Sequence, residues 1–412
     1  MRTIFLMAAL AVTALGATLP KGNPKDVGLA ADRLARIRPA IQAYIDRHEI
    51  AGAVALIARR GKVAYLETMG VMDLESRKPM QPDTIFRIAS MTKPIASVAA
   101  MMLYEEGRFQ LNDPVSKFIP EFKDPKVAVP TAPNETASAM YRTVPAAREI
   151  TIRDLLTHTA GLANTYNGVT MEAYARLARE RQPEDTVGDM TKRLAKLPLQ
   201  FHPGTAWAYG PATDVVGHLV EVISGQALDR FFEERIFQPL GMADTHFYAP
   251  PGKEARYATA YTPAQPKGLK PTPRLPGGAR RYFSGAGGLA STAPDYFRFS
   301  QMLLNGGQLD GARLLSPKTV ELMTSNHIGK LPLWPTLAGY RFGLGFRVLT
   351  DLGEAANAGS VGNYGWGGAL GTIFWNDPKE QLIGILMIQV RPYNHLNIRQ
   401  DIQTLAYQAM VD

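Results

Sequence analysis

A serine and a lysine three positions apart are the residues whose types and spacing best fit covalent chemistry. They open and close the run Ser90-Met91-Thr92-Lys93, the one S-x-x-K in the sequence. Residues three apart on a helix share a face, so the Lys93 amine is expected beside the Ser90 hydroxyl. A neutral amine there can remove the hydroxyl proton, which predicts Ser90 as a nucleophile and Lys93 as its general base.

Pro94 indicates where the helix that carries this pair begins. Proline lacks an N–H and clashes with the preceding turn, so a helix accepts it only in its first turn. The apolar pattern that continues to Tyr104 therefore predicts a helix starting near Ser90. The positive end of its dipole would favour an alkoxide at Ser90 and disfavour the ammonium form of Lys93. The alternative is an ordinary N-cap serine beside a solvated lysine.

A tyrosine on an interrupted loop is the third candidate. Tyr209 lies in segment 207–214, where a Gly-Pro pair breaks the chain just before a predicted helix over 214–223. A phenol so placed can relay a proton to a leaving alcohol, either directly or through Lys93. The alternative is a tyrosine that packs at a helix entry.

Segment 364–371 is rich in glycine and leads into a predicted strand over 372–375. Glycines at this density let the backbone approach a ligand closely, and an N–H on an edge strand could then form half of an oxyanion hole. The alternative is a bulge or a tight turn.

Several segments together resemble the family VIII carboxylesterases, which are similar to class C β-lactamases and penicillin-binding proteins. The segments are residues 86–94, 112–115 (Asn-Asp-Pro-Val), 155–162 (Leu-Leu-Thr-His-Thr-Ala-Gly-Leu), 207–225 and 362–375. Their order and spacing match, so the resemblance runs from about Asp32 to the C-terminus.

The resemblance implies roles for individual residues in a cycle that needs no cofactor. Ser90 would be acylated, Lys93 would be its base, and Tyr209 would shuttle the proton. The backbone N–H groups of Ser90 and Ala369 would form the oxyanion hole. His158 would be a structural residue near the junction of two lobes, outside the catalytic set.

The sequence departs from the β-lactamase pattern at two positions that bear on the substrate. Trp366, Gly367 and Gly368 stand where β-lactamases have Lys-Thr-Gly, and the resemblance implies that they bind substrate. Trp366 thus replaces a lysine that helps hold a β-lactam carboxylate, and Pro211 replaces an asparagine that contacts the substrate amide. An indole offers apolar area and one donor without charge. Both changes favour hydrophobic esters with short-to-medium acyl groups.

Other functions of the same site stay open. A β-lactamase, an amide hydrolase or D-amino-acid peptidase, or an acyl transferase would use the same serine, lysine and tyrosine. A non-catalytic penicillin-binding-like receptor is an alternative of another class. No serine lies in G-x-S-x-G, which disfavours an α/β-hydrolase fold.

The elements that must position these residues are strands at both ends of the chain and helices between them. Strand patterns lie at 52–59, 62–68, 343–349, 370–375 and 382–389, and helical patterns lie at 32–48, through most of 83–322, and at 396–410. This order predicts an α+β fold, in which terminal strands form one antiparallel sheet flanked by helices and carrying an inserted helical lobe. The resemblance implies a β-lactamase/transpeptidase-like fold.

The predicted domain organisation follows from that arrangement. Residues 25–82 and 325–412 would form the α/β lobe, and residues 83–324 would form the mainly helical lobe. The active site is expected in the cleft between them.

Composition narrows the class of partner. The 412 residues are 46% hydrophobic and 20% charged, which is typical of a packed globular enzyme. The net charge of +8 comes from scattered lysines and arginines, so nucleic acid is not expected as a partner. There is no cysteine, and the seven histidines lack metal-ligand spacing, so no metal is implied. The predicted partner is a small-molecule ester, and the oligomeric state stays open.

The N-terminus matches a secretory signal. An arginine at position 2 precedes an apolar stretch over 4–15 and a small-residue pattern before Ala17, which predicts a signal peptide over 1–17. The stretch is too short to span a bilayer. Periplasmic or secreted location is the prediction, and an apolar N-terminal helix of a cytoplasmic protein is the alternative.

Overall fold

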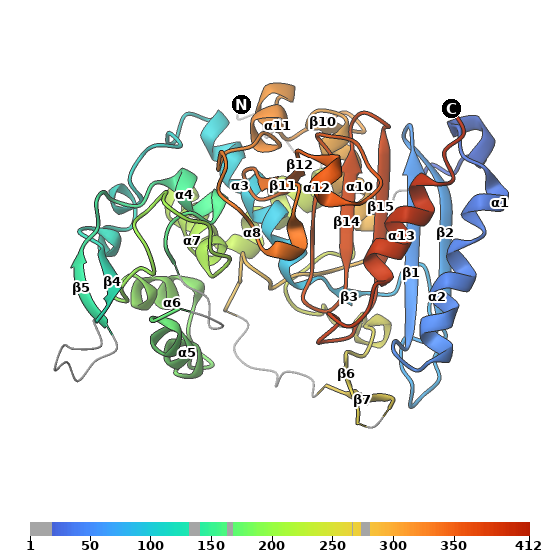
Figure 1. The fold of residues 1–412 in the computed structure, drawn as a ribbon, viewed down its shortest axis with the longest axis horizontal. Coiled ribbons are helices and arrows are strands. Elements are labelled where there is room, and N and C mark those ends of the chain that lie inside the picture. The colour runs from blue at the N-terminus through green and yellow to red at the C-terminus, as the bar shows by residue number, and fades with distance from the viewer. Residues whose placement is uncertain (1–18, 132–140, 163–167, 266, 273–280) are drawn as a thin grey trace, which may run out of the picture.

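A seven-stranded antiparallel sheet forms much of the right-hand half of the molecule in Figure 1. The computed structural model describes residues 19–131, 141–162, 168–265, 267–272 and 281–412. The strand order is β11-β12-β13-β14-β15-β1-β2. The strands are β1 (Gly52–Arg59), β2 (Lys62–Gly70), β11 (Tyr340–Phe342), β12 (Arg347–Leu349), β13 (Tyr364–Gly367), β14 (Ile373–Asp377) and β15 (Leu382–Met387). The N-terminal hairpin pairs with the last C-terminal strand, which confirms the predicted sheet.

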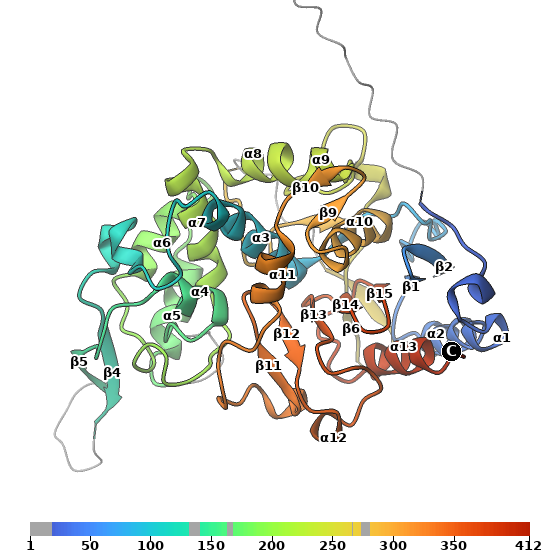
Figure 2. The ribbon, with the colours of Figure 1, turned by 90° about the horizontal axis from the view of Figure 1, so that it is seen from above.

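The sheet separates two hydrophobic cores. Along β1, Ala55 and Ile57 join the core under α2 (Ile37–Asp46) and α13 (Ile398–Tyr407), whereas Leu56 joins the core under α10 (Ala293–Leu304). Figure 2 shows α2 and α13 on one side of the sheet and α10 on the other. Because β1 is buried on both faces, its sequence is a continuous apolar run rather than an alternating one.

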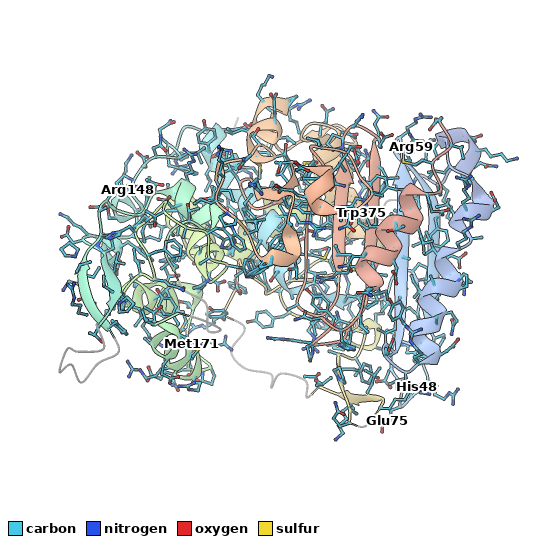
Figure 3. All side chains as sticks on the ribbon, viewed as in Figure 1. His48, Arg59, Glu75, Arg148, Met171 and Trp375 are labelled. Atoms are coloured by element: carbon cyan, nitrogen blue, oxygen red, sulfur yellow. The ribbon has the colours of Figure 1, made fainter. Side chains whose placement is uncertain are left out.

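The helical part packs around α3 (Thr92–Glu105), which is buried from its first residue to Leu103. Its main partner is α7 (Ala212–Ser224). The other α-helices are α1 (Ala31–Leu34), α4 (Ile152–Thr157), α5 (Met171–Arg179), α6 (Val187–Leu194), α8 (Leu228–Phe232), α9 (Gln238–Leu240), α11 (Pro317–Met323) and α12 (Leu352–Ala355). Figure 3 shows the long axis of the molecule, with Arg148 of the helical part toward one end and Arg59 of β1 toward the other. The exact lobe boundaries stay a prediction.

Short elements make up much of the remaining chain. The short helical turns are η1 (Pro24–Val27), η2 (Ala89–Met91), η3 (Val115–Lys117), η4 (Pro120–Phe122), η5 (Glu233–Phe237), η6 (Glu254–Arg256) and η7 (Pro335–Leu337). Four two-stranded sheets pair β3 (Phe86–Arg87) with β8 (Ala290–Ser291), β4 (Lys126–Pro130) with β5 (Tyr141–Pro145), β6 (Tyr261–Pro263) with β7 (Leu269–Pro271), and β9 (Gln308–Leu309) with β10 (Ala312–Arg313). The sequence pattern did not predict them because strands of two to five residues carry too little periodicity.

One predicted strand is a hairpin. The expected strand over 343–349 begins only at Arg347, and the residues before it turn back to β11. Gly345 has a φ of 95°, and a Cβ there would lie 2.2 Å from the Ser97 hydroxyl, so the turn needs glycine against α3. No helix of the described part is long and apolar enough to cross a membrane. The predicted signal peptide falls outside the described residues. The location of the protein therefore stays a prediction.

Candidate active site

Ser90 lies in η2, a single turn that continues directly into α3, as the position of Pro94 predicted. The residue before it, Ala89, has a φ of 45°, which a residue with a side chain seldom adopts. The Thr92 hydroxyl donates to the Ala89 carbonyl at 2.7 Å and accepts from the Leu289 N–H at 3.1 Å. The backbone that presents Ser90 is thus held in an unusual conformation by contacts on both sides.

The lysine lies beside the serine, one helical turn away. The distance from Lys93 Nζ to Ser90 Oγ is 3.4 Å, and Nζ also donates to the Ala286 carbonyl at 2.7 Å. The Lys93 side chain is buried, and no carboxylate of the described residues pairs with it. The alternative of a solvated surface lysine does not fit this environment.

Tyr209 joins the pair, but through its ring. Lys93 Nζ lies 4.6 Å from the centre of the Tyr209 ring. The Tyr209 hydroxyl instead accepts a hydrogen bond of 3.2 Å from Nε1 of Trp366. Within the described parts of the chain, no hydrogen bond joins that hydroxyl to Ser90 or Lys93. The structure therefore brings four predicted residues together, with the phenol oxygen bound to the indole.

An aromatic cluster surrounds Tyr209 and extends to the surface. Its members are His158, Trp207, Tyr209, Trp334, Phe342 and Trp366. Trp334 meets Tyr209 and Trp207 edge-on at 5.1 Å between ring centres and lies nearly parallel to Trp366 at 6.3 Å. Trp334 is 39% exposed, whereas Trp366 is 5% exposed. The sequence analysis did not single out Trp334, which lies in an unpatterned Pro-rich loop.

His158 packs against the ring of Tyr209. It ends α4 in the left-handed conformation, and its ring lies 4.9 Å from the Tyr209 ring. Burial holds the pKa of His158 well below its usual range. The Ala208 N–H donates to the His158 carbonyl at 3.0 Å, which ties the tyrosine loop to α4. These contacts agree with a structural role.

The glycine-rich segment forms β13 and the turn into β14. A Cβ on Gly368 would lie 2.3 Å from the Ile88 carbonyl, so only glycine lets this turn approach the backbone just before Ser90. Ala369 follows directly in the turn. β13 pairs with β14 along its whole length but with β12 only at Tyr364 and Gly365, so the expected edge exists only at Trp366 and Gly367.

A carboxylate on α7 holds the loop that contacts Lys93. Asp214 Oδ1 accepts from the Ser284 hydroxyl at 2.6 Å and from the Ala286 N–H at 3.0 Å. The carbonyl of the same Ala286 is the acceptor for Lys93. The run Ser-Gly-Ala-Gly-Gly at 284–288 was the sequence feature that could have indicated this loop.

Other places in the described structure offer no metal chemistry. No group of three or more histidine, aspartate and glutamate side chains within residues 19–412, outside the undescribed gaps, could hold a metal ion. A cavity of about 400 Å³ lies between the β1–β2 hairpin and α10, and a second of about 390 Å³ lies beside α4. Neither is lined by Ser90, Lys93 or Tyr209.

Comparison with known proteins identifies the family of the chain. The model of the beta-lactamase family matches residues 37–408. The chain belongs to the beta-lactamase family. Among its relatives, Protein Rv1367c of Mycobacterium tuberculosis strain H37Rv is 37% identical over 86% of this chain and 89% of that protein. Esterase EstB of Burkholderia gladioli is 30% identical over 84% of this chain and 88% of that protein.

A solved structure extends the comparison to three dimensions. EstCE1, described as a hydrolase with promiscuous acyltransferase activity, has a TM-score of 0.75 and 29% sequence identity, and covers 92% of this chain and 99% of its own. The β-lactamase/transpeptidase-like fold and the resemblance to family VIII esterases are thereby confirmed. The activities found among these beta-lactamase relatives are ester hydrolysis and acyl transfer.

Proposed function

We propose that this beta-lactamase-family chain is a carboxylic ester hydrolase that works through an acyl-Ser90 intermediate. The observation that carries the proposal is the 3.4 Å contact between Lys93 Nζ and Ser90 Oγ, in a buried setting next to Tyr209. The names of EstB and EstCE1 support hydrolysis of esters as the activity class.

The proposed cycle keeps every proton accounted for. Uncharged Lys93 takes the Ser90 proton while Oγ attacks the ester carbonyl, and the N–H groups of Ser90 and Ala369 stabilise the oxyanion. Collapse breaks the ester C–O bond, and the proton returns to the leaving alcohol from Lys93 or Tyr209. A water molecule then attacks the acyl-enzyme and gives a proton to the same pair. The pair passes this proton to Ser90 Oγ as the acyl C–O bond breaks, which releases the acid and restores free Ser90. In this structure the Tyr209 hydroxyl is bound to Trp366 and not to Ser90 or Lys93. Catalytic hydrogen bonds often form fully only when substrate is bound, so this arrangement is compatible with the cycle.

The aromatic cluster argues for uncharged, hydrophobic substrates. Trp366 donates its single N–H to Tyr209, so the rest of its ring can offer only apolar contact. Trp334 adds an indole at the outer end of the cluster. Esters with hydrophobic, short-to-medium acyl groups fit such surroundings better than an anionic β-lactam does.

Acyl transfer is the second candidate, and the description of EstCE1 favours it. The acyl-enzyme is the same, and an alcohol replaces water in the second step. Adding a primary alcohol to the assay would reveal it, since the product becomes a new ester while release of the first alcohol continues.

The test compares the parent chain with Ser90→Ala, using a short p-nitrophenyl ester and a chromogenic cephalosporin. We expect ester turnover well above cephalosporin turnover, loss of both in Ser90→Ala, and a fluorophosphonate adduct on Ser90 detected by mass spectrometry. An unlabelled, inactive parent of native fold would instead favour a binding protein. Faster turnover of the cephalosporin would favour a β-lactamase.

A further inference from the structure

Arg399 on α13 binds the turn between β13 and β14. Its guanidinium donates to the carbonyls of Gly371 at 3.2 Å and Thr372 at 2.6 Å, and to the carbonyl of Gly368. It also donates to the Tyr393 hydroxyl and lies 3.8 Å from the centre of that ring. One side chain thus holds three carbonyls that flank the two residues at the tip of the turn.

The guanidinium carries a charge that no described carboxylate neutralises. None of the ion pairs found among the described residues includes Arg399. Burial lowers its pKa to about 10, and the charged or ionisable groups acting on it are Tyr393, Arg347 and Tyr209. An arginine suits such a place because its planar fork can bind several carbonyls at once. Lysine, a point charge on a flexible stem, cannot reproduce that geometry.

The turn that Arg399 holds contacts the backbone at Ile88, two residues before Ser90. On the turn's other side, Gly368 packs against the Ile88 carbonyl so closely that a Cβ would lie 2.3 Å away. Arg399 and the segment before Ser90 therefore contact the same turn from different sides. Gly367 is fitted to the arginine too, since a Cβ there would lie 2.9 Å from the guanidinium. Ala369, at the tip, therefore lies between residues that are held on both sides.

We propose that Arg399 is a positioning residue for ester hydrolysis: it fixes the Gly368–Gly371 turn so that the Ala369 N–H meets the oxyanion. This inference rests on the proposed acyl-Ser90 function. The charge of Arg399 also favours a developing oxyanion, because its partners there are neutral carbonyls. Loss of Arg399 should therefore raise the energy of the transition state more than the energy of the bound ester.

The experiment compares Arg399→Lys and Arg399→Gln with Arg59→Lys in the full chain. Arg59 serves as the control, since it is buried and also donates to three carbonyls, those of Val27, Gly28 and Glu380. It differs from Arg399 in that it pairs with the carboxylates of Glu380 and Asp412. It lies on β1, two strands beyond β14 in the sheet and far from the turn. Active sites are first titrated with a fluorophosphonate, so that unfolded molecules do not enter the rate.

We expect kcat per titrated site to fall by about 10- to 100-fold in both Arg399 variants, with KM within about threefold of the parent value. Affinity for an alkyl boronic acid, a mimic of the tetrahedral intermediate, should fall by a similar factor. Arg59→Lys should keep kcat within about twofold. Parent-like kcat and boronic acid affinity in Arg399→Lys, or a loss explained wholly by fewer titratable sites, would overturn the inference. If the parent itself is neither active nor labelled on Ser90, the proposed function fails first.

Discussion

At the scale of single residues, the amine of Lys93 decides between catalysis and mere packing. It bridges the Ala286 carbonyl and the Ser90 hydroxyl, so a methionine of similar length would fill its space without accepting a proton. We expect Lys93→Met to lower kcat for a p-nitrophenyl ester by about 10²- to 10⁴-fold, the range attributed to general acid–base catalysis. Steady-state kinetics with a circular dichroism check of folding would measure this. Hydrolysis at the parent rate would show that another group takes the proton.

Trp334 allows a test of the acyl or alcohol site at the same scale. Its ring contacts Tyr209, Trp207 and Trp366 while remaining 39% exposed, so its removal should open the wall without collapsing it. We expect Trp334→Ala to raise KM for phenyl esters by about three- to tenfold, because an aromatic contact is worth about 0.5–1.5 kcal/mol. KM for ethyl acetate should change little. Equal changes for both esters would argue that Trp334 supports the fold instead of contacting substrate.

At the scale of elements, the loop over 284–288 connects α7 to Lys93. Asp214 in the first turn of α7 holds both the Ser284 hydroxyl and the Ala286 N–H, and the Ala286 carbonyl holds the amine. Asp214→Ala should release this loop and misplace Lys93, lowering kcat by about 10- to 100-fold. The readout is kcat measured together with KM, since a displaced amine slows the chemical step more than it weakens ester binding.

A matched variant separates this effect from loss of a helix start. Asp189→Ala also removes a first-turn carboxylate, from α6, where Asp189 pairs with Thr186 in a capping box. It should reduce stability by about 1 kcal/mol and leave kcat unchanged. If both variants behave alike, Asp214 serves the helix and not the lysine.

The elements also show which parts of the site a sequence can predict. Ser90, Lys93 and Pro94 lie within one turn, so local helix geometry was enough to place them together. Strand β13 was harder, because two of its four residues are glycines that oppose strand formation, and pairing with both neighbours overrides that preference.

Contacts between distant segments could not be predicted from spacing. Arg399 lies some thirty residues after the turn that it holds, and Asp214 lies 72 positions from Ala286. Nothing in their own neighbourhoods distinguishes them from surface residues, since their partners are backbone groups of other elements. The Tyr209 hydroxyl is a similar case: its position in the loop predicted a proton relay, and only packing shows that it binds Trp366.

At the scale of the whole molecule, α10 joins the sheet to the serine helix. It packs on β14, β15 and β1, while the hydroxyl of Tyr296 donates to the Met91 carbonyl at 2.9 Å. Near its start, Asp295 is buried and accepts from the Asp244 N–H at 2.7 Å and the Thr245 hydroxyl at 2.9 Å. Burial raises the pKa of Asp295 to about 6 from its ordinary 3.8.

This shift sets a pH dependence of global stability with a definite sign. Because the folded chain binds the Asp295 proton more tightly than the unfolded chain does, the resulting stabilisation is complete below pH 4 and is lost as pH rises to about 6. Asp295→Asn cannot ionise, so the free energy of unfolding of the parent relative to this variant should fall across that window, by about 3 kcal/mol at about 1.4 kcal/mol per pKa unit. Urea unfolding of both chains at several pH values measures the difference, and the other carboxylates cancel. A difference that is constant from pH 4 to 7 would mean that Asp295 is ionised in the folded protein throughout, and that α10 is held by its other contacts alone.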